Sequence, residues 1–272
     1  MKPPGVKGRF PWRLGATSFV IPADVLENVR FLAGLVDDIQ ILYFESQAGS
    51  SLEHDVPVAD LKAVAVDHDL TYTVHLPLDI SLGAADPALR QQGLDEICRI
   101  IDALHDLSPV CYDLHLNRAT GDRDQWLENL DVSLSLLSER LGAATGTIGV
   151  ENVDFALDPL LPMLEKYGLG LCLDIGHAVR YGQSLDTLFE SIPRAVHIHA
   201  HGVFQGRDHL PLTSKQEVPM RTVAELLCRH AYTGVLTLEM YDWESLQTSM
   251  QSLHEIWHNL SSLDHHLTSD TV

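Results

Sequence analysis

Histidines and carboxylates recur at the ends of short apolar runs in this chain. Runs spread over the whole sequence end in, or are followed by, such residues: Glu45, His75, His115, Glu151, Asp174 with His177, His199 with His201, and Glu239. Asp208 and His209 follow the run that holds His199. Mixed nitrogen and oxygen donors suit Zn, Mn or Fe better than Mg or Ca, which prefer oxygen alone. These residue types therefore predict a divalent-metal centre.

The elements that must position these residues are short β-type runs that alternate with amphipathic segments. The predicted strands are Leu14–Phe19, Ile39–Glu45, Thr71–Leu76, Val110–Leu116, Thr147–Val153, Gly170–Ile175, Ala195–His201 and Val235–Tyr241. Helices are predicted between them. One holds Trp126 and Leu141, and the others begin near Pro22, Pro57, Asp86, Asp158, Ser184, Val218 and Asp242, where Asp, Ser or Pro favours a helix start.

Eight strand–helix units in about 250 residues are typical of an α/β fold, the (β/α)₈ TIM barrel. A doubly wound open sheet is the alternative, but no Gly-rich phosphate loop follows the first run. No linker or low-complexity stretch divides the chain. We therefore expect one domain over 1–272, with the barrel at about 12–260 and short polar tails at both ends.

The barrel brings the candidate residues together, because active sites in this fold lie at the carboxyl ends of the strands. At least six strands would direct imidazoles or carboxylates to one rim. Along 195–201, His197, His199 and His201 alternate with apolar residues, so all three share the face that points into the barrel. We expect His197 to be deepest, and Asp113 and His197 to fill polar layers of the barrel interior.

Charge and cysteine content narrow the class of protein. The chain has 272 residues, with 38 Asp or Glu against 18 Lys or Arg, a formal net charge of −20. This charge counts against nucleic acid or an anionic membrane as a partner and favours a small-molecule substrate. The four cysteines form no Cys-x-x-Cys pair, which counts against a cysteine-based zinc site. Apolar surroundings of the cysteines and the lack of a signal-peptide run predict a cytoplasmic protein.

The order of the candidate ligands resembles a known superfamily. His75, His115, Glu151-Asn152, Asp174-Ile175-Gly176-His177, His199, His209 and Glu239 are similar to the xylose-isomerase-like barrels, most closely the apurinic endonuclease type 2 (endonuclease IV-like) branch. That resemblance implies two or three divalent ions, usually Zn²⁺, with Mn²⁺ or Fe²⁺ as alternatives. His75, His115 and Glu151 would bind the first ion, and Asp174, His177, His199, His209 and Glu239 would complete the cluster. Asp208 falls one position away from the family's Asp-x-His pattern.

A second resemblance lies in the first third of the chain. Residues 17–24, 28–33 and 36–39, with Phe44-Glu45-Ser46, resemble the cobamide-remodelling phosphodiesterases, a branch of the same superfamily. It implies hydrolysis of a phosphoester in the nucleotide loop of a cobamide, with a metal-activated hydroxide attacking phosphorus and the lower base released as its riboside. The catalytic candidates are Glu151 and Glu239. The substrate-binding candidates are Glu45, Asn117, Arg118, Asn152, Arg180 and His201.

Three other functions stay open at this point. A sugar isomerase or epimerase needs only Glu151, Asp174, His199 and Glu239 around one Mn or Mg ion, and all four are present. An apurinic endonuclease would use the same three metals, but it should present basic loops to DNA. A corrinoid carrier without catalysis would not need a nearly complete ligand set. We therefore expect a phosphodiesterase, with the isomerase or epimerase as the first alternative.

Overall fold

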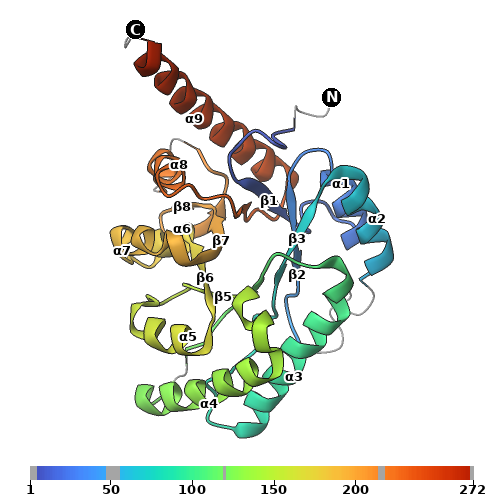
Figure 1. Ribbon diagram of the computed structural model, residues 1–272, viewed down its shortest axis with the longest axis vertical. Helices are drawn as coiled ribbons and strands as arrows, with labels where there is room; N and C mark the ends of the chain where they lie inside the picture. The colour runs from blue at the N-terminus through green and yellow to red at the C-terminus, as the bar shows by residue number, and fades with distance from the viewer. Residues whose placement is uncertain (1–4, 47–55, 119–120, 214–217, 270–272) are drawn as a thin grey trace.

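Eight parallel strands form a closed barrel in the computed structural model, which describes residues 5–46, 56–118, 121–213 and 218–269 (Figure 1). The strand order around the barrel is β1-β10-β7-β6-β5-β4-β3-β2. The barrel strands are β1 Arg13–Thr17, β2 Asp38–Leu42, β3 Thr71–His75, β4 Tyr112–Leu114, β5 Ile148–Glu151, β6 Gly170–Asp174, β7 Ala195–Ala200 and β10 Val235–Leu238. All eight predicted strands are present, each ending earlier than predicted, and the (β/α)₈ prediction is confirmed.

Helices connect the strands and surround them. The α-helices are α1 Val25–Leu32, α2 Val58–His68, α3 Pro87–Leu104, α4 Arg123–Leu141, α5 Leu161–Tyr167, α6 Ile175–Arg180, α7 Leu185–Glu190, α8 Met220–Arg229 and α9 Trp243–Ser269. Short 3₁₀ helices lie at η1 His105–Leu107, η2 Gly142–Thr147, η3 Asp158–Leu160 and η4 Ile192–Arg194. Asp86 and Ser184 cap α3 and α7 through their side chains, as expected from residues of this type. At Asp158 the structure has η3 before α5 begins.

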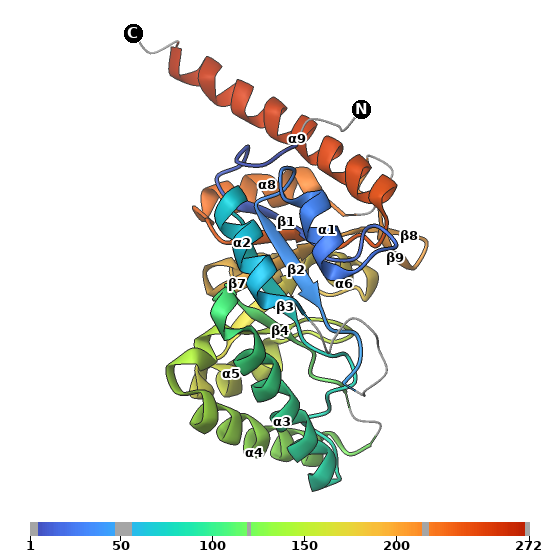
Figure 2. The ribbon, with the colours of Figure 1, turned by 90° about the vertical axis from the view of Figure 1, so that its right-hand side faces the viewer.

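The last helix extends well beyond the barrel. Figure 2 shows α9 running past the strands and the other helices. Trp257 of α9 packs edge-on against Trp12 at 5.4 Å between ring centroids, and Phe10 stacks on Trp12 at 5.3 Å. These contacts join α9 to the segment that precedes β1. Within the described part of the chain, no helix has the length and apolar character needed to cross a membrane.

Three short elements near the rim differ from the sequence prediction. The sixth strand ends at Asp174 rather than Ile175, because the Asp174 side chain accepts a hydrogen bond from the backbone N–H of His177 at 2.7 Å and so starts α6. The predicted loop after β7 holds a hairpin of β8 Gly202–Phe204 and β9 Arg207–Leu210. Gln205 and Gly206 both have positive φ, the geometry of a tight hairpin turn.

The side chains that point into the barrel are polar, whereas those on the outer faces of its strands are apolar. Side chains such as Ile39, Val150 and Ile198 point outward and are buried against the helices. Fully buried polar residues fill the inside: Thr17, Asp38, Gln40, Thr73, Asp113, His197 and Thr237. Barrels of this fold usually fill the same space with bulky apolar side chains. Because buried polar groups need partners, this interior must be held by hydrogen bonds.

Candidate metal centre

Glu151, the last residue of β5, lies at the middle of the rim and is almost fully buried. Its Oε2 is 3.1 Å from His115 Nε2 and 3.5 Å from His75 Nε2. Its Oε1 is 3.1 Å from His177 Nδ1. The two oxygens of one carboxylate therefore face two groups of imidazoles, which come from β3 and the segment after β4 on one side and from α6 on the other.

A second group lies at the ends of β6, β7 and β10. His199 Nδ1 is 3.2 Å from Glu239 Oε1 and 3.9 Å from Asp174 Oδ2. The same nitrogen is 3.5 Å from Glu151 Oε2, so this group and the first share Glu151. All four side chains are buried. Parallel strands that end at one rim are what bring three carboxylates and an imidazole into contact.

The hairpin after β7 adds a third group. The ring centroids of His177 and His209 are 5.5 Å apart, and those of His201 and His209 are 4.2 Å apart. Asp208 forms an ion pair with Arg180, and its Oδ1 is 3.4 Å from His209 Nδ1. Asp208 is thus held at the rim by Arg180 of α6, although the spacing of its motif differs from the family pattern.

His201 lies behind this group and faces Asp174. Its Nδ1 accepts a hydrogen bond from the backbone N–H of His209 at 3.1 Å, and its Nε2 is 3.2 Å from Asp174 Oδ1. A Cβ on Gly176 would collide with the His201 ring, so α6 can cover this imidazole only with glycine there. His201 therefore lies against the Asp174 carboxylate, a position that its place in the sequence alone did not indicate.

These donors fit a divalent cation. His75, His115 and Glu151 bring three donor atoms within 4.8 Å of one another, and so do Asp174, His199 and Glu239. Asp174 Oδ2, His199 Nδ1 and His201 Nε2 are buried without a hydrogen-bond partner among the described residues. Because an unpartnered buried polar atom is costly, atoms of this kind gathered in one cluster indicate a ligand that satisfies them.

The charges of the ionisable groups in this cluster also favour the binding of a cation. Burial opposes ionisation of Glu151, but the imidazoles of His115 and His199 outweigh it and hold the pKa of Glu151 well below its usual range. Burial likewise acts against the charge on Glu239, yet His199 lowers the pKa of Glu239 to about 2. The pKa of His177 rises to about 11, because the nearby Asp174 and Glu151 outweigh its burial. Ionised carboxylates thus hold protons on neighbouring imidazoles, and a metal ion that binds there would release those protons.

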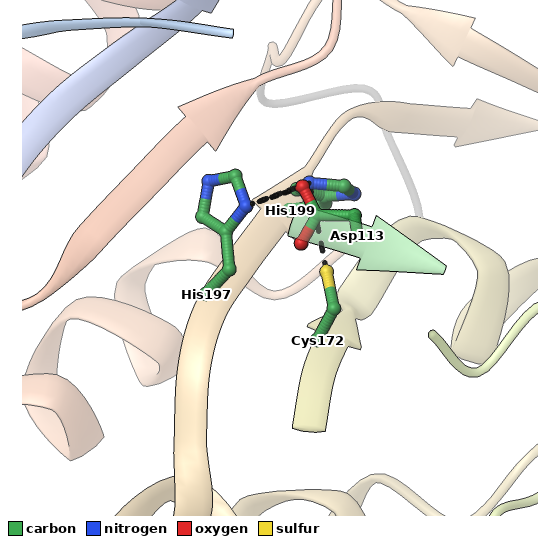
Figure 3. A group of neighbouring side chains, drawn as sticks. All are labelled: Asp113, Cys172, His197 and His199. Atoms are coloured by element: carbon green, nitrogen blue, oxygen red, sulfur yellow. Dashed lines mark hydrogen bonds and ion pairs between the residues drawn. The ribbon is translucent and has the colours of Figure 1, made fainter. Parts of the chain in front are cut away.

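Beneath the rim lies a buried layer formed by Asp113, Cys172 and His197 around the inner side of His199 (Figure 3). His197 Nδ1 is 2.8 Å from Asp113 Oδ2, and His197 Nε2 is 2.7 Å from Thr237 Oγ1. Cys172 Sγ is 3.5 Å from His199 Nε2. The expected polar filling by Asp113 and His197 is therefore present, and His199 presents one nitrogen to the rim and the other to this layer.

Sequence reasoning missed two neighbours of His199. Gln40 Nε2 lies 2.8 Å from His199 Nε2 and donates to Asp113 Oδ2 at 3.1 Å. Cys172 precedes Asp174 by two residues, so strand alternation places both side chains on the inward face. That spacing could have identified Cys172. No local signal identifies Gln40, because its contact with His199 depends on the barrel closing.

The match to a family model decides which family this is. Residues 33–256 match the model described as the xylose isomerase-like TIM barrel. The chain belongs to this family. No curated protein matches the chain in sequence.

Solved structures share the fold of this xylose isomerase-like barrel. A D-tagatose 3-epimerase-like protein is 18% identical with a TM-score of 0.77, over 92% of this chain and 98% of its own. An L-ribulose 3-epimerase is 18% identical with a TM-score of 0.75, over 96% and 98%. A 3-keto-D-glucoside 4-epimerase from E. coli is 16% identical with a TM-score of 0.72, over 90% and 98%. At these identities the likeness shows the fold alone.

Two of the predicted substrate-binding residues of this xylose isomerase-like barrel form hydrogen bonds with its backbone. Asn152 Nδ2 donates to the carbonyl of Asp174 at 2.8 Å, and its Oδ1 accepts from the Asp174 N–H at 2.8 Å. Asn117 Nδ2 donates to the carbonyls of Leu78 and Ile80 at 2.6 and 3.0 Å. Asn152 therefore fixes the end of β6, and Asn117 fixes the segment after β3. A direct contact of either with substrate stays a prediction.

The other substrate-binding candidates lie at different depths. Glu45 and Arg118 are exposed, in the segments that follow β2 and β4. Arg180 is also exposed and forms an ion pair with Asp208, whereas His201 is fully buried. Their roles toward a substrate stay predictions. The three exposed residues can reach a bound molecule, whereas His201 acts through the side chains that it contacts.

A cavity of about 220 Å³ opens above the metal-binding groups. Its polar floor includes His75, His115, Glu151, His177, His209 and Glu239. Its walls are apolar and largely aromatic, from Leu42, Tyr43, Phe44, Leu78, Val153 and Tyr241. A polar floor below apolar walls is the usual form of a small-molecule site.

Proposed function

We propose that the chain is a metal-dependent phosphodiesterase. The observation that carries the proposal is the position of Glu151, which has His75 and His115 on one side and His177 on the other. The group of Asp174, His199 and Glu239 brings three donor atoms together and could hold one ion by itself. A reaction that uses one ion leaves the first imidazole pair without a role, whereas phosphoester hydrolysis by two or more ions uses it.

The residues that would hold the ions divide around Glu151. His75, His115 and Glu151 would hold one ion, and Glu151, Asp174, His199 and Glu239 would hold another. His177 and His209, with Asp208 beside them, would hold a third. Divalent ions bound in such groups lower the pKa of water and neutralise charge on phosphate oxygens.

The protein's own groups position the reaction. Glu151 and Glu239 are ionised at neutral pH because neighbouring imidazoles lower their pKa values, so both carboxylates are available as anionic ligands and as hydrogen-bond acceptors for water. Asn152 fixes the backbone of Asp174 and His201 faces its carboxylate, which keeps this ligand oriented. The aromatic walls restrict water above the floor, and a drier site strengthens each electrostatic contact within it.

We further propose a cobamide as the substrate. The support is the resemblance of residues 17–46 to cobamide-remodelling phosphodiesterases. The end of that segment forms part of the cavity, since Leu42, Tyr43 and Phe44 line it. The resemblance therefore concerns residues that would contact a substrate. A neutral, largely apolar wall suits the bulky non-ionic part of such a molecule.

A second candidate is a sugar isomerase or epimerase. The comparisons favour it, because the three solved structures described above are those of epimerases or an epimerase-like protein. Glu151 and Glu239 both approach His199, at 3.5 and 3.2 Å. Two carboxylates around one ion could remove a proton from one face of a sugar carbon and return it to the other. The second candidate differs from the first in the number of ions that it needs.

One experiment separates the two candidates. The purified protein is analysed for metal content, then incubated with a cobamide and, separately, with a panel of ketoses, and the products are identified by mass and by chromatography. Two or more ions per chain and hydrolysis of the cobamide are expected. One ion per chain with ketose epimerisation and an intact cobamide would establish the second candidate instead. The Glu151→Gln variant is the negative control for both reactions.

A further inference from the structure

A second cavity of about 270 Å³ lies beside the metal centre. Two segments line both cavities. The segment after β4 gives His115 to the first and Arg118 to the second, and the segment after β5 gives Val153 to the first and Phe155 to the second. Arg123 and Trp126 of α4 complete the wall. A molecule bound over Glu151 could therefore extend into this second cavity.

The aromatic wall of the second cavity is held in place before any ligand binds. Trp126 Nε1 donates to the carbonyl of Asn117 at 3.0 Å. Its ring meets that of Phe155 edge-on, with centroids 5.7 Å apart and planes at 90°. A Cβ on Gly83 would collide with the Trp126 ring, so the chain has glycine where the indole packs. A rigid indole loses little conformational freedom when a ligand stacks on it.

Two arginine side chains line the same cavity. Arg118 and Arg123 are exposed, and neither forms an ion pair or hydrogen bond within the described part of the chain. Arg123 lies between two exposed carboxylates in the sequence, of which Asp122 caps α4 by accepting from the N–H groups of Asp124 and Gln125, and neither Asp122 nor Asp124 forms an ion pair with it. In a chain of net charge −20, two such guanidinium groups beside an apolar cavity make a local site for an anion.

We propose that this cavity is a subsite for a planar heteroaromatic ring joined to a phosphate, which is the base-bearing half of a nucleotide-like phosphodiester. This inference rests on the proposed function, because it places the scissile phosphate between the two cavities. The ring stacks against Trp126 and Phe155, as bases do on aromatic side chains. Arg118 and Arg123 contact the phosphate or stack on the ring with their planar guanidinium groups.

Equilibrium binding of adenosine 5′-monophosphate to the purified full chain tests the subsite. The probe has a planar base and one phosphate, and adenosine and inorganic phosphate separate the two parts. We expect the Arg118→Ala/Arg123→Ala variant to bind the probe at least tenfold more weakly than the unaltered chain. The matched control, Arg221→Ala/Arg229→Ala, removes the same charge from the exposed side of α8 and should leave the affinity unchanged.

Further variants keep the result interpretable. Phe155→Ala should weaken binding of both the probe and adenosine, because the stacking wall is lost. His75→Ala should leave adenosine binding unchanged, because it alters the metal centre and not the stacking wall. Equal affinity of the Arg118→Ala/Arg123→Ala variant and its control would overturn the proposal, and so would inorganic phosphate binding as tightly as the probe.

The two proposals fail in different ways. If the probe binds as expected while no phosphodiester is hydrolysed, the proposed function is wrong and the subsite stands. If a cobamide is hydrolysed at the same KM by the Arg118→Ala/Arg123→Ala variant and by its control, the subsite is wrong and the proposed function stands. A thermal unfolding midpoint equal to that of the unaltered chain confirms that each exposed-arginine variant is folded.

Discussion

The rim of the barrel and the layer beneath it are built from the same kinds of side chain, yet they differ in how those side chains are satisfied. Both contain histidine and aspartate, and both bring donor atoms within 4.8 Å of one another. At the rim, Asp174 Oδ2 and His199 Nδ1 have no hydrogen-bond partner among the described residues. In the layer, Asp113 and His197 bond to each other and to Gln40 and Thr237, and only Gln40 Oε1 lacks a partner among the described residues.

The difference shows that donor type and spacing alone do not identify a metal site. A set of histidines and carboxylates whose atoms already bond to one another is a structural network. A set that leaves several buried nitrogen and oxygen atoms unpartnered at one place is a better candidate for holding a cation. His199 belongs to both regions, because Nδ1 faces the rim and Nε2 faces the layer. The layer therefore holds the imidazole that the rim uses, as outer partners of metal ligands do.

The Glu151→Gln variant should have the largest effect on activity. In Glu151→Gln, an amide replaces the carboxylate and removes the negative charge that faces the imidazoles. A loss of several kcal/mol of transition-state stabilisation lowers the reaction rate by about 1000-fold. Metal content should fall by at least one ion per chain, and the thermal midpoint of the metal-free protein should fall as well, because ionised Glu151 interacts favourably with His115 and His199 in the folded state. Elemental analysis and thermal unfolding check these outcomes. Unchanged metal content would place the ions away from Glu151 and remove the contrast between the two regions.

The Asp113→Ala variant should lower stability without lowering the metal content. It removes the hydrogen-bond partner of His197 at a fully buried position, and leaving a buried polar group without its partner costs about 3 kcal/mol. The free energy of unfolding should fall by that amount, with the number of bound ions unchanged. Denaturant unfolding and elemental analysis measure the two quantities. The milder Thr237→Val variant, which removes one hydrogen bond to His197, should lower stability by about 1 kcal/mol.

The hairpin after β7 is expected to give a smaller effect, limited to one ion. His209→Ala removes an imidazole that faces His177 and should reduce the metal content by one ion per chain, with activity lowered but measurable. Asp208→Asn removes a carboxylate that Arg180 already neutralises, so it should leave metal content nearly unchanged. Elemental analysis of the two variants side by side checks this difference. Equal losses in both would make Asp208 a ligand of the same rank as His209.

The sequence was sufficient to predict the elements that have strong local signals. Eight strands follow from alternating or apolar runs, and Asp86 and Ser184 cap their helices as such residues do. Strand alternation also predicted which histidines of 195–201 face inward. The donor residues at the rim followed from one rule about where barrel strands end.

Contacts that depend on barrel closure could not be predicted in this way. Gln40 meets His199 only because β2 and β7 lie across a closed barrel. The short helix α6 and the hairpin β8–β9 have too few residues for a periodic pattern. They are set by the Asp174 cap and by the turn at Gln205 and Gly206. The same holds for Arg180, whose pairing with Asp208 joins α6 to β9.

A third buried carboxylate extends the comparison to the opposite end of the barrel strands. Asp38, at the start of β2, is fully buried and accepts hydrogen bonds from Thr71 Oγ1 at 2.6 Å and Thr73 Oγ1 at 2.8 Å. Burial dominates here and raises the pKa of Asp38, because the two hydroxyl donors only partly offset the lost solvation. Asp38 thus differs from the buried carboxylates Glu151 and Asp174, because neighbouring imidazoles lower the pKa values of those two.

The sign of this shift gives the smallest predicted effect. A carboxyl group with a raised pKa in the folded state stabilises the protein while protonated, below the unfolded value near 3.9, and that contribution is lost as pH rises through the folded pKa. Asp38→Asn imitates the protonated form, so it should stabilise the chain at pH 7 and bring no gain at pH 3.5. Denaturant unfolding of both proteins at the two pH values measures this. A gain that is equal at both values would mean that the pKa of Asp38 is the same in the folded and unfolded chain, and that the hydroxyl groups of Thr71 and Thr73 fully offset its burial.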